Sequence, residues 1–372
     1  MNNNSTQKRI LIVNTTLDIG GIESFLANLS ENIDKKNYNI FFLTYSNKKF
    51  DFEDKIIKSG STILRKQSPK KISKIAHLKQ LIKIIKKVKP DVVHSNTYFD
   101  SLYVLLAALY CSVPVRIAHS HTSRANSVGL HKKVQHTLAR PAINLLSTEN
   151  IACSKDAGIA LFGRKQFRII PNGVNEEKFI FDYTKRAKLR EKLGADKDTV
   201  IVGHIGRLDK VKNHKFLLKL FHDYHSLKPN SFLLLAGQGP ERQAILKKAK
   251  SLGIHKRVFL FEKETDTSCF YSAMDVLVFP SIYEGLPLAL VEAQLNELPI
   301  FASNKISNEV KFTKNIKFID LDDYQKWLNY LLDAEARNIV YFKDRKETPY
   351  SIKRTLKVIY DVYSPAETNN EN

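Results

Sequence analysis

The strongest constraint on the fold is an alternation of short apolar runs with helical patterns, which occurs twice along the chain. In the first half, runs typical of β-strands lie at residues 10–14, 39–45, 91–94, 115–119, 150–153 and 168–170. After residue 195 the expected strands are 199–205, 232–236, 258–261, 276–279 and 300–302. Strands separated by helices pair in parallel, because the connecting helix returns the chain to the same edge. The sequence therefore predicts an α/β protein with two doubly wound, Rossmann-like domains.

The domain boundary is expected in the charged segment 175–197, which has helical character and no strand pattern. A chain of 372 residues suits two domains of ordinary size. We expect a first domain over residues 1–180 and a second over 181–348. A helical segment at 349–363 is expected to pack back on the first domain, and the polar tail 364–372 to be disordered.

The composition is strongly basic, with 59 Lys and Arg against 38 Asp and Glu and a formal charge of +21. Such a surplus suits nucleic acid, an anionic membrane or a phosphorylated small molecule, unless it reflects a generally lysine-rich composition. No nucleic-acid-binding module is recognisable, so no nucleic-acid partner is expected. The longest apolar run, 102–111, is shorter than the ~20 residues of a membrane span. We expect a cytoplasmic protein, either free or peripheral on the inner face of the membrane.

The three cysteines, Cys111, Cys153 and Cys269, are far apart and odd in number. This spacing indicates neither a disulfide framework nor a cysteine zinc site. No D-x-D pattern suggests a metal site either, so no metal requirement is expected.

Glycines follow the first expected strand, where Gly20 and Gly21 precede a helix that begins near Glu23. Glycines let a ligand approach the backbone, and the start of a helix presents N–H groups to phosphate. A plain tight turn is the alternative. After strand 232–236, Gly237 and Gly239 again mark a turn into a helix, and here too a ligand contact and a simple connection are both open.

The loop after strand 199–205 carries Gly206, Arg207 and Lys212. Arg207 can place its planar fork on two phosphate oxygens and Lys212 can add a point charge, so the loop suits a diphosphate. A solvated basic turn is the alternative.

Glu284 precedes a turn at Gly285 and Leu286, and Glu292 lies one turn inside the helix that begins near Leu288. A carboxylate beside a phosphate would be repelled, so we expect these two to accept hydrogen bonds from sugar hydroxyls. Solvated surface glutamates are the alternative.

Together these motifs resemble those of a known enzyme family. They are Gly20-Gly21-Ile22-Glu23, Asn172-Gly173-Val174, Gly206-Arg207-Leu208 with Lys212-Asn213, Gly237–Pro240, and the pair Glu284 and Glu292. Five motifs in this order, covering nearly the whole chain, are similar to those of the retaining GT-B glycosyltransferases of family 4. The nearest resemblance is to the bacterial enzymes of exopolysaccharide and capsule assembly.

The resemblance implies a GT-B fold, with two Rossmann-like domains facing each other across a cleft. It implies a nucleotide-diphosphate sugar as donor, with a UDP-sugar favoured over a GDP-sugar, and no further cofactor. Arg207 and Lys212 would hold the diphosphate, Glu292 the ribose and Glu284 the donor sugar. Gly21 would lie close to the phosphates from the first domain.

The resemblance also implies an active-site histidine in the first domain. This is His119, at the end of strand 115–119, or His121 two residues later. The family is proposed to retain anomeric configuration by front-face attack, in which the leaving phosphate takes the proton from the acceptor hydroxyl. The protein then mainly stabilises departing negative charge. The acceptor would be a saccharide, expected to be lipid-linked.

A cluster of basic residues suggests where a lipid-linked acceptor would be met. It comprises Arg65, Lys66, Lys70, Lys71, Lys74, Lys79, Lys83, Lys86, Lys87 and Lys89. An anionic membrane attracts such a cluster. Alternatively, segment 72–88 is an amphipathic core helix, with Ile75, Leu78, Ile82 and Ile85 on one face and lysines in solvent.

Two other functions share this fold: a nucleotide-sugar 2-epimerase and a non-catalytic GT-B partner subunit. The first lacks this set of glycine motifs. The second tends to lose the glutamate pair or the basic clamp, both of which are present here.

Overall fold

The computed structural model of the chain describes residues 7–18, 20–121, 130–262, 266–334 and 348–364, with side chains from residue 136 onward in the third range. The chain forms two compact units. Unit 1 comprises residues 1–173 and 352–372, and unit 2 comprises residues 174–351.

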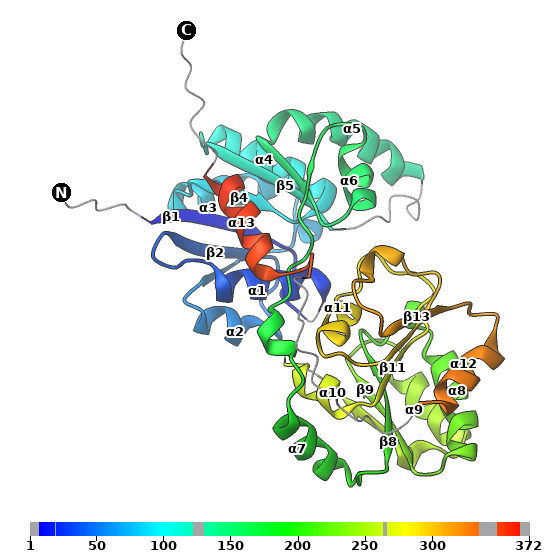
Figure 1. The fold of residues 1–372 in the computed structure, drawn as a ribbon. Helices are drawn as coiled ribbons and strands as arrows, with labels where there is room; N and C mark the ends of the chain where they lie inside the picture. The colour runs from blue at the N-terminus through cyan, green and yellow to red at the C-terminus, as the bar shows by residue number, and fades with distance from the viewer. Residues whose placement is uncertain (1–6, 19, 122–129, 263–265, 335–347, 365–372) are drawn as a thin grey trace. The chain divides into compact units, whose positions relative to one another are not determined.

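Unit 1 is built on a seven-stranded sheet of order β3-β2-β1-β4-β5-β6-β7, in which every pair of neighbours is parallel (Figure 1). The strands are β1 (Lys8–Val13), β2 (Tyr38–Thr44), β3 (Thr62–Arg65), β4 (Val92–Ser95), β5 (Val115–Ser120), β6 (Glu149–Ala152) and β7 (Arg168–Ile169). The helices are α1 (Gly21–Asn32), α2 (Glu53–Lys58), α3 (Lys74–Val88), α4 (Ser101–Tyr110), α5 (Leu130–Leu146), α6 (Lys155–Phe162) and α13 (Ile352–Tyr363).

The apolar run of β1 is explained by burial on both faces of the sheet. Ile10 and Ile12 pack into a cluster with residues of α1 and α13, whereas Leu11 and Val13 pack into a second cluster with residues of α3 and α4. Successive side chains alternate between the two faces of a strand, so one continuous apolar segment supplies both cores.

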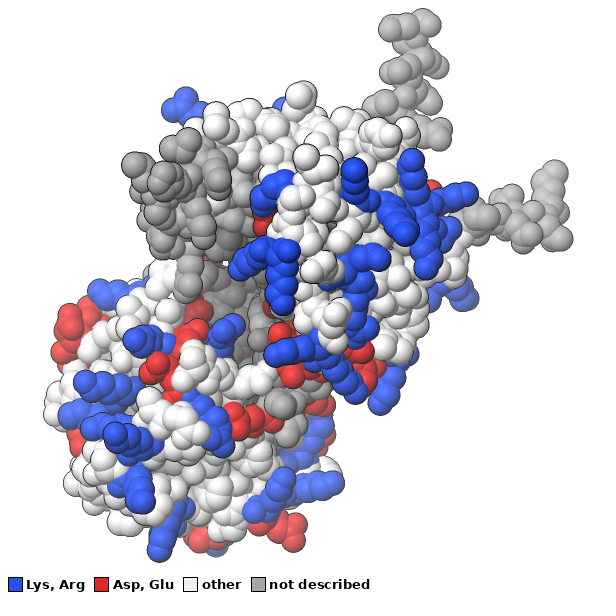
Figure 2. All heavy atoms as spheres, turned by 180° about the vertical axis from the view of Figure 1, so that it is seen from behind, with Lys and Arg blue, Asp and Glu red and all other residues white. Residues whose placement is uncertain are grey.

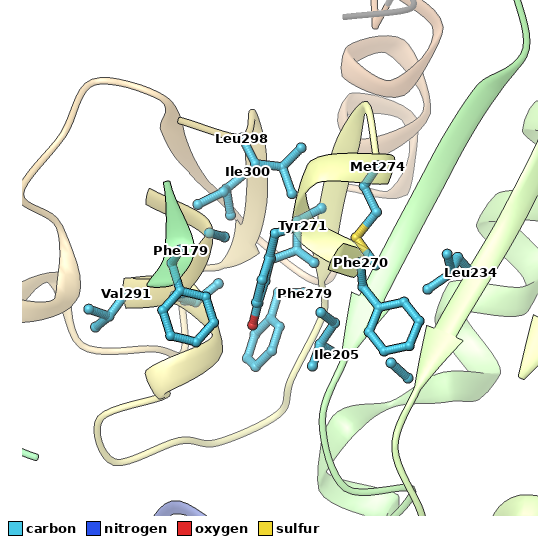
Figure 3. Packing of buried hydrophobic residues seen from close by; sticks show 14 of the residues in the cluster. Phe179, Ile205, Leu234, Phe270, Tyr271, Met274, Phe279, Val291, Leu298 and Ile300 are labelled. Atoms are coloured by element: carbon cyan, nitrogen blue, oxygen red, sulfur yellow. The ribbon is translucent and has the colours of Figure 1, made fainter. Parts of the chain in front are cut away.

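Unit 2 repeats the architecture with six parallel strands in the order β10-β9-β8-β11-β12-β13. The strands are β8 (Val200–Ile205), β9 (Ser231–Ala236), β10 (Val258–Phe261), β11 (Val276–Phe279), β12 (Ile300–Ser303) and β13 (Ile316–Ile319). The α-helices are α7 (Tyr183–Leu193), α8 (His214–Leu227), α9 (Arg242–Ser251), α10 (Ser268–Ala273), α11 (Leu288–Leu295) and α12 (Tyr324–Leu332). Figure 3 shows one of its two cores, where Phe179, Tyr271 and Phe279 pack beside strand residues such as Ile205 and Leu234.

The units divide at different residues from those expected. Residues 174–180 belong to unit 2, because the backbone N–H of Val174 donates to the carbonyl of Tyr350 and Phe179 is buried in the unit 2 core. The second crossing lies between Ser351 and Ile352, after which α13 packs on unit 1. The expected disordered tail lies, from residue 365 onward, outside the described residues.

Two strands were missing from the sequence-based set, β3 and β13, and each lies at one of the two edges of its sheet. Each is four residues long and mixes apolar with basic side chains. Neither strand is buried along its whole length, so neither carries the continuous apolar run of a strand that is covered on both faces.

The apolar stripe assigned to segment 72–88 is largely, but not wholly, packed on the core. Ile85 is buried, and Leu78 and Ile82 are half-buried against the same cluster. The buried residues of α3 are His77, Leu81, Ile84, Ile85 and Val88. Ile75 is 70% exposed, so the helix has apolar side chains on a second, outward face. Among the described residues, no helix is long and apolar enough to cross a bilayer.

Helix α13 should carry much of the stability of unit 1, because its apolar side chains complete that core. The substitution Ile359→Ala removes a fully buried side chain and should lower the free energy of unfolding by about 2–4 kcal/mol. Lys357→Ala, on the exposed side of the same helix, should change it by less than about 0.5 kcal/mol. Urea unfolding monitored by circular dichroism measures both, and equal effects would contradict this assignment.

Candidate active site

The motif loops of unit 2 leave the carboxyl ends of three neighbouring strands. Strand β8 lies between β9 and β11 in the sheet. Gly206 follows β8, Gly237 follows β9, and the segment beginning at Pro280 follows β11. The carboxyl edge of a parallel sheet, where the strand order reverses, is the position at which such folds bind ligands.

The glycines of the first two loops are required by close backbone packing. A Cβ atom at Gly237 would collide with the carbonyl oxygen of Gly206, and one at Gly239 with that of Leu208. The backbone N–H of Leu208 donates to the carbonyl of Gln238 at 2.9 Å. Gly237 and Gly239 therefore fix the shape of the loop that carries Arg207 and Lys212.

Lys212 and Glu284 form an ion pair, with 2.6 Å between Nζ and Oε1. Their side chains are 13% and 15% exposed, so the pair is largely shielded from solvent. The ammonium also lies 4.8 Å from the centre of the Phe279 ring. The structure thus brings the expected phosphate-binding cation and the expected sugar-binding carboxylate to one point.

Arg207 is held differently, since its side chain is 66% exposed and its Nε lies 4.0 Å from Asp209 Oδ2. Asp209 instead accepts hydrogen bonds from the backbone N–H groups of Val211 and Lys212. This cap fixes the backbone of Lys212 and leaves the Arg207 guanidinium in solvent, accessible to an anion.

Glu292 lies on α11 and accepts a hydrogen bond from the Tyr271 hydroxyl at 2.6 Å. Tyr271 is fully buried, and burial together with the charge of Glu292 raises the pKa of its hydroxyl well above the usual value. The phenol therefore keeps its proton and orients the carboxylate. Figure 3 shows the Tyr271 ring within the apolar core.

The turn between the two glutamates is open at Gly285, where an added Cβ atom would meet nothing within 4 Å. Leu286 is half-buried against the unit 2 core. The backbone N–H of Ile282 donates to the carbonyl of Val211 at 2.8 Å, which joins this turn to the loop of Lys212. The Ser281 hydroxyl is buried here without a hydrogen-bond partner among the described residues.

In unit 1, the glycine loop leads into α1. Gly20 abuts the Glu23 side chain, whose Oε1 accepts hydrogen bonds from Asn14 and Thr16. Burial raises the pKa of Glu23. An added Cβ atom at Gly21 would meet nothing within 4 Å, so the first turn of α1 is accessible to a ligand.

Both candidate histidines lie at the end of β5, with 3.7 Å between their ring centres. His119 is fully buried, and its Nε2 has no hydrogen-bond partner among the described residues. His121 is less buried and its Nε2 donates to Asn96 Oδ1 at 2.7 Å. Phe25 of α1 packs against both rings.

The histidines at this edge are held neutral by their surroundings. Burial, and then the charge of His121, lowers the pKa of His94 to about 3. Burial lowers the pKa of His121 to about 3 as well. Burial, followed by the charges of His121 and His94, lowers the pKa of His119 well below its usual value. These groups can donate or accept hydrogen bonds at neutral pH but do not hold a positive charge.

The sequence did not point to three residues that contact the candidate site residues directly or through one partner. Tyr271 binds Glu292, His94 binds His119, and Tyr363 binds His94. Tyr271 precedes Glu292 by 21 residues and gave no local signal. His94 did leave a signal, because it ends the expected strand 91–94, and this strand lies beside the one that carries His119. In the described part of the chain, no group of three or more His, Cys, Asp or Glu side chains is arranged to hold a metal ion.

Comparisons with known proteins agree with this fold. The family model for glycosyl transferases group 1 matches residues 185–332, and the model for glycosyltransferase family 4 matches residues 19–178. The chain is 33% identical over 314 residues to EpsF of Bacillus subtilis (strain 168), provisionally named a glycosyltransferase, with 82% of each chain covered.

Two further relatives bear more specific names. One is an Escherichia coli UDP-Gal:alpha-D-GlcNAc-diphosphoundecaprenol alpha-1,3-galactosyltransferase, 28% identical over 78% of this chain and 80% of the relative. The other is the Staphylococcus aureus capsular polysaccharide biosynthesis glycosyltransferase CapH, 26% identical over 71% and 73%. Among solved structures, Anabaena HepE in complex with UDP and glucose matches with a TM-score of 0.73 and 17% identity, over 88% of this chain and 89% of HepE.

The neutral histidines should make unit 1 sensitive to acid. Their pKa near 3 in the folded state lies below the ordinary value of 6.5, so the unfolded chain binds protons first as the pH falls. The contribution of the neutral histidines to the free energy of unfolding should be fully present above about pH 6.5. It should decrease toward pH 3, by up to about 1.4 kcal/mol per pH unit for each histidine.

Urea unfolding between pH 7 and pH 5 measures this slope. His94→Gln should reduce it, whereas His255→Gln, at an exposed position, serves as the control. An unchanged slope in the His94 variant would contradict the assignment.

Proposed function

Because the chain belongs to the family 4 glycosyltransferases of the GT-B fold, we propose that it transfers a sugar from a nucleotide-diphosphate sugar to a saccharide acceptor in the assembly of a bacterial exopolysaccharide or capsule. The observation that carries the proposal is the convergence of Lys212, Glu284 and Glu292 at one edge of the unit 2 sheet.

The donor binds with its diphosphate on the loop after β8. Lys212 supplies a shielded cation and Arg207 an exposed one, and both favour the charge that develops on the leaving phosphate. A UDP-sugar is favoured over a GDP-sugar. The names of two similar proteins support this choice, since one uses UDP-Gal and the other was solved with UDP and glucose.

The two glutamates bind hydroxyl groups. A donor diphosphate would compete with Glu284 for Lys212, which leaves the Glu284 carboxylate able to accept hydrogen bonds from the adjacent sugar. Glu292, oriented by Tyr271, accepts from the ribose hydroxyls. Transfer proceeds with retention by front-face attack, in which the phosphate accepts the proton of the incoming hydroxyl. No metal ion and no further cofactor are needed.

The acceptor is lipid-linked and is met at the inner face of the cytoplasmic membrane. The name of the Escherichia coli relative supports this choice, since its acceptor is a diphosphoundecaprenol. The surface of α3 and α4 supports it independently. A groove between these helices is lined by Ile75, Leu78, Ile82, Leu106 and Tyr110. Three lysines, at 79, 83 and 86, also line this groove.

Several features of this α3–α4 surface suit an anionic membrane. Ile75 and Tyr110 are 70% and 68% exposed, so large apolar groups face solvent between cations. Figure 2 shows Lys and Arg side chains gathered on the visible face of unit 1. Apolar side chains can enter the headgroup region while lysines meet anionic lipid, and each lysine contributes about 1 kcal/mol.

The cation at the phosphate site gives a direct test of the transferase. Lys212→Ala should slow nucleotide release from the preferred donor by about a hundredfold or more. The matched control is Lys210→Ala, an exposed lysine of the same loop, which should retain most of the activity. Panels of UDP- and GDP-sugars with membrane lipid extract identify the donor. Folded wild-type protein that releases nucleotide from none of them would refute the proposal, and an unimpaired Lys212 variant would refute the phosphate role.

Membrane docking is tested with vesicles. The protein should sediment with phosphatidylglycerol vesicles at low salt, and replacing Lys79, Lys83 and Lys86 together by alanine should weaken partitioning by about a hundredfold. A triple alanine variant at the exposed Lys247, Lys250 and Lys256 of unit 2 removes the same charge and should bind as the wild type does. Equal losses in both variants would indicate a non-specific charge effect and contradict the α3–α4 surface.

A further inference from the structure

Three aromatic side chains of unit 1 form a continuous hydrogen-bonded line beneath the candidate active site. The Tyr363 hydroxyl lies 2.9 Å from His94 Nδ1, and His94 Nε2 lies 3.0 Å from His119 Nδ1. All three side chains are fully buried. They come from α13, β4 and β5, so the last turn of α13 is joined through His94 to the candidate active-site residue His119.

The sheet register makes this line possible. His94 is paired with Ile117, and His119 lies two residues further along β5. Side chains alternate along a strand, so both histidines project from the same face of the sheet. Ile117 packs with residues of α13 on this face, which is why Tyr363 meets His94 there.

The direction of the hydrogen bonds follows from the phenol. Burial raises the pKa of Tyr363, so its hydroxyl keeps the proton. His94 is the only partner of this hydroxyl among the described residues, and a buried hydroxyl proton without an acceptor costs about 1–3 kcal/mol. Tyr363 therefore donates to His94 Nδ1, and His94 carries its hydrogen on Nε2.

The same reasoning passes to the next ring. His94 Nε2–H donates to His119 Nδ1, so the hydrogen of neutral His119 must reside on Nε2. In the opposite arrangement, His119 Nε2 would be an acceptor and the Tyr363 proton would lack an acceptor. His119 Nε2 is the one ring nitrogen of this line without a partner among the described residues.

We propose that Tyr363 and His94 are positioning residues that fix the tautomer of His119, so that its Nε2–H donates a hydrogen bond to an oxygen of the reacting sugar. The inference rests on the proposed function for its substrate, whereas the tautomer itself is a property of the free protein. No proton is transferred, because the hydrogen bonds of the line only determine which ring nitrogen carries each hydrogen. An orphaned buried N–H is costly, and a bound oxygen accounts for its presence.

The neighbouring histidine does not compete for this role. His121 donates its Nε2–H to Asn96 and packs against the His119 ring at a tilt. It shields His119 but leaves the His119 Nε2–H unused. The line needs a neutral His94, because a second proton on its ring would remove the acceptor of the Tyr363 hydroxyl.

The tautomer is measured by nuclear magnetic resonance on full-length protein labelled with 15N-histidine, from the ring couplings of His119 identified by their loss in His119→Gln. The wild type should carry the hydrogen on Nε2. In Tyr363→Phe the His119 signals should move toward a mixture of tautomers. Tyr360→Phe is the matched control, because Tyr360 lies on the same helix and its hydroxyl binds the Asp34 backbone, not a histidine. It should leave the His119 signals unchanged.

Substitution of His94 distinguishes positioning from packing. The amide N–H of His94→Gln can still donate to His119 Nδ1, whereas His94→Leu fills similar space without a donor. We expect the glutamine variant to keep the Nε2–H tautomer and the leucine variant to lose it.

Turnover supplies the second measurement. Nucleotide release from UDP-glucose and UDP-galactose should fall about tenfold in Tyr363→Phe and His94→Leu, and less in His94→Gln and Tyr360→Phe. A wild-type His119 that carries its hydrogen on Nδ1, or a tautomer unaffected by Tyr363→Phe, would overturn the proposal that the line fixes the tautomer. A changed tautomer with unchanged turnover would overturn its role in positioning. If the wild type has the expected tautomer but releases nucleotide from no nucleotide sugar, the result counts against the proposed function and still supports the fixing of the tautomer by the line.

Discussion

Parallel pairing of every strand is the constraint on which both units depend. It places the carboxyl ends of all strands at one edge of each sheet, and the reversal of strand order brings the loops after β1, β4 and β5 together in unit 1, and those after β9, β8 and β11 in unit 2. Residues as distant in sequence as Lys212 and Glu284 can then form an ion pair. The sheets provide rigid positions, and the loops provide the chemistry.

Within unit 2, the shielded cation of the candidate site is paired with a carboxylate. Lys212 is compensated by Glu284 in a largely shielded pair, because an unpaired buried ammonium would be costly. In the proposed function, a bound diphosphate would take the place of Glu284 as the anionic partner of Lys212. Arg207, exposed and weakly held, can move to the phosphate without breaking a strong contact. In the proposed function, the two cations stabilise the leaving phosphate and the two glutamates bind hydroxyl groups.

The sequence was informative wherever the residues of a short segment determine its structure by themselves. Continuous apolar runs predicted the inner strands, and the motif loops were correctly placed after β1, β8, β9 and β11. The edge strands β3 and β13 were missed because partial burial weakens the pattern, whereas the edge strand β10 keeps an apolar run and was predicted. For α3, the period of apolar residues was visible, but only packing decides that Leu81 is buried and Ile75 exposed. Partners such as Tyr271 for Glu292 arise from tertiary packing and leave no local pattern.

The position of α13 links the folding of unit 1 to its chemistry. The chain leaves unit 1 after Gly173 and returns only at Ile352. Helix α13, which lies near the C-terminus, therefore completes a core that begins with β1. Without Leu356, Ile359 and Val362, the apolar face of β1, β4 and β5 would lie exposed to water. The same helix supplies the hydroxyl that orients His94, so the burial that stabilises unit 1 also sets the hydrogen on His119. A partly folded chain lacking this helix would therefore lose the order of the site together with the core, which couples activity to completion of the fold.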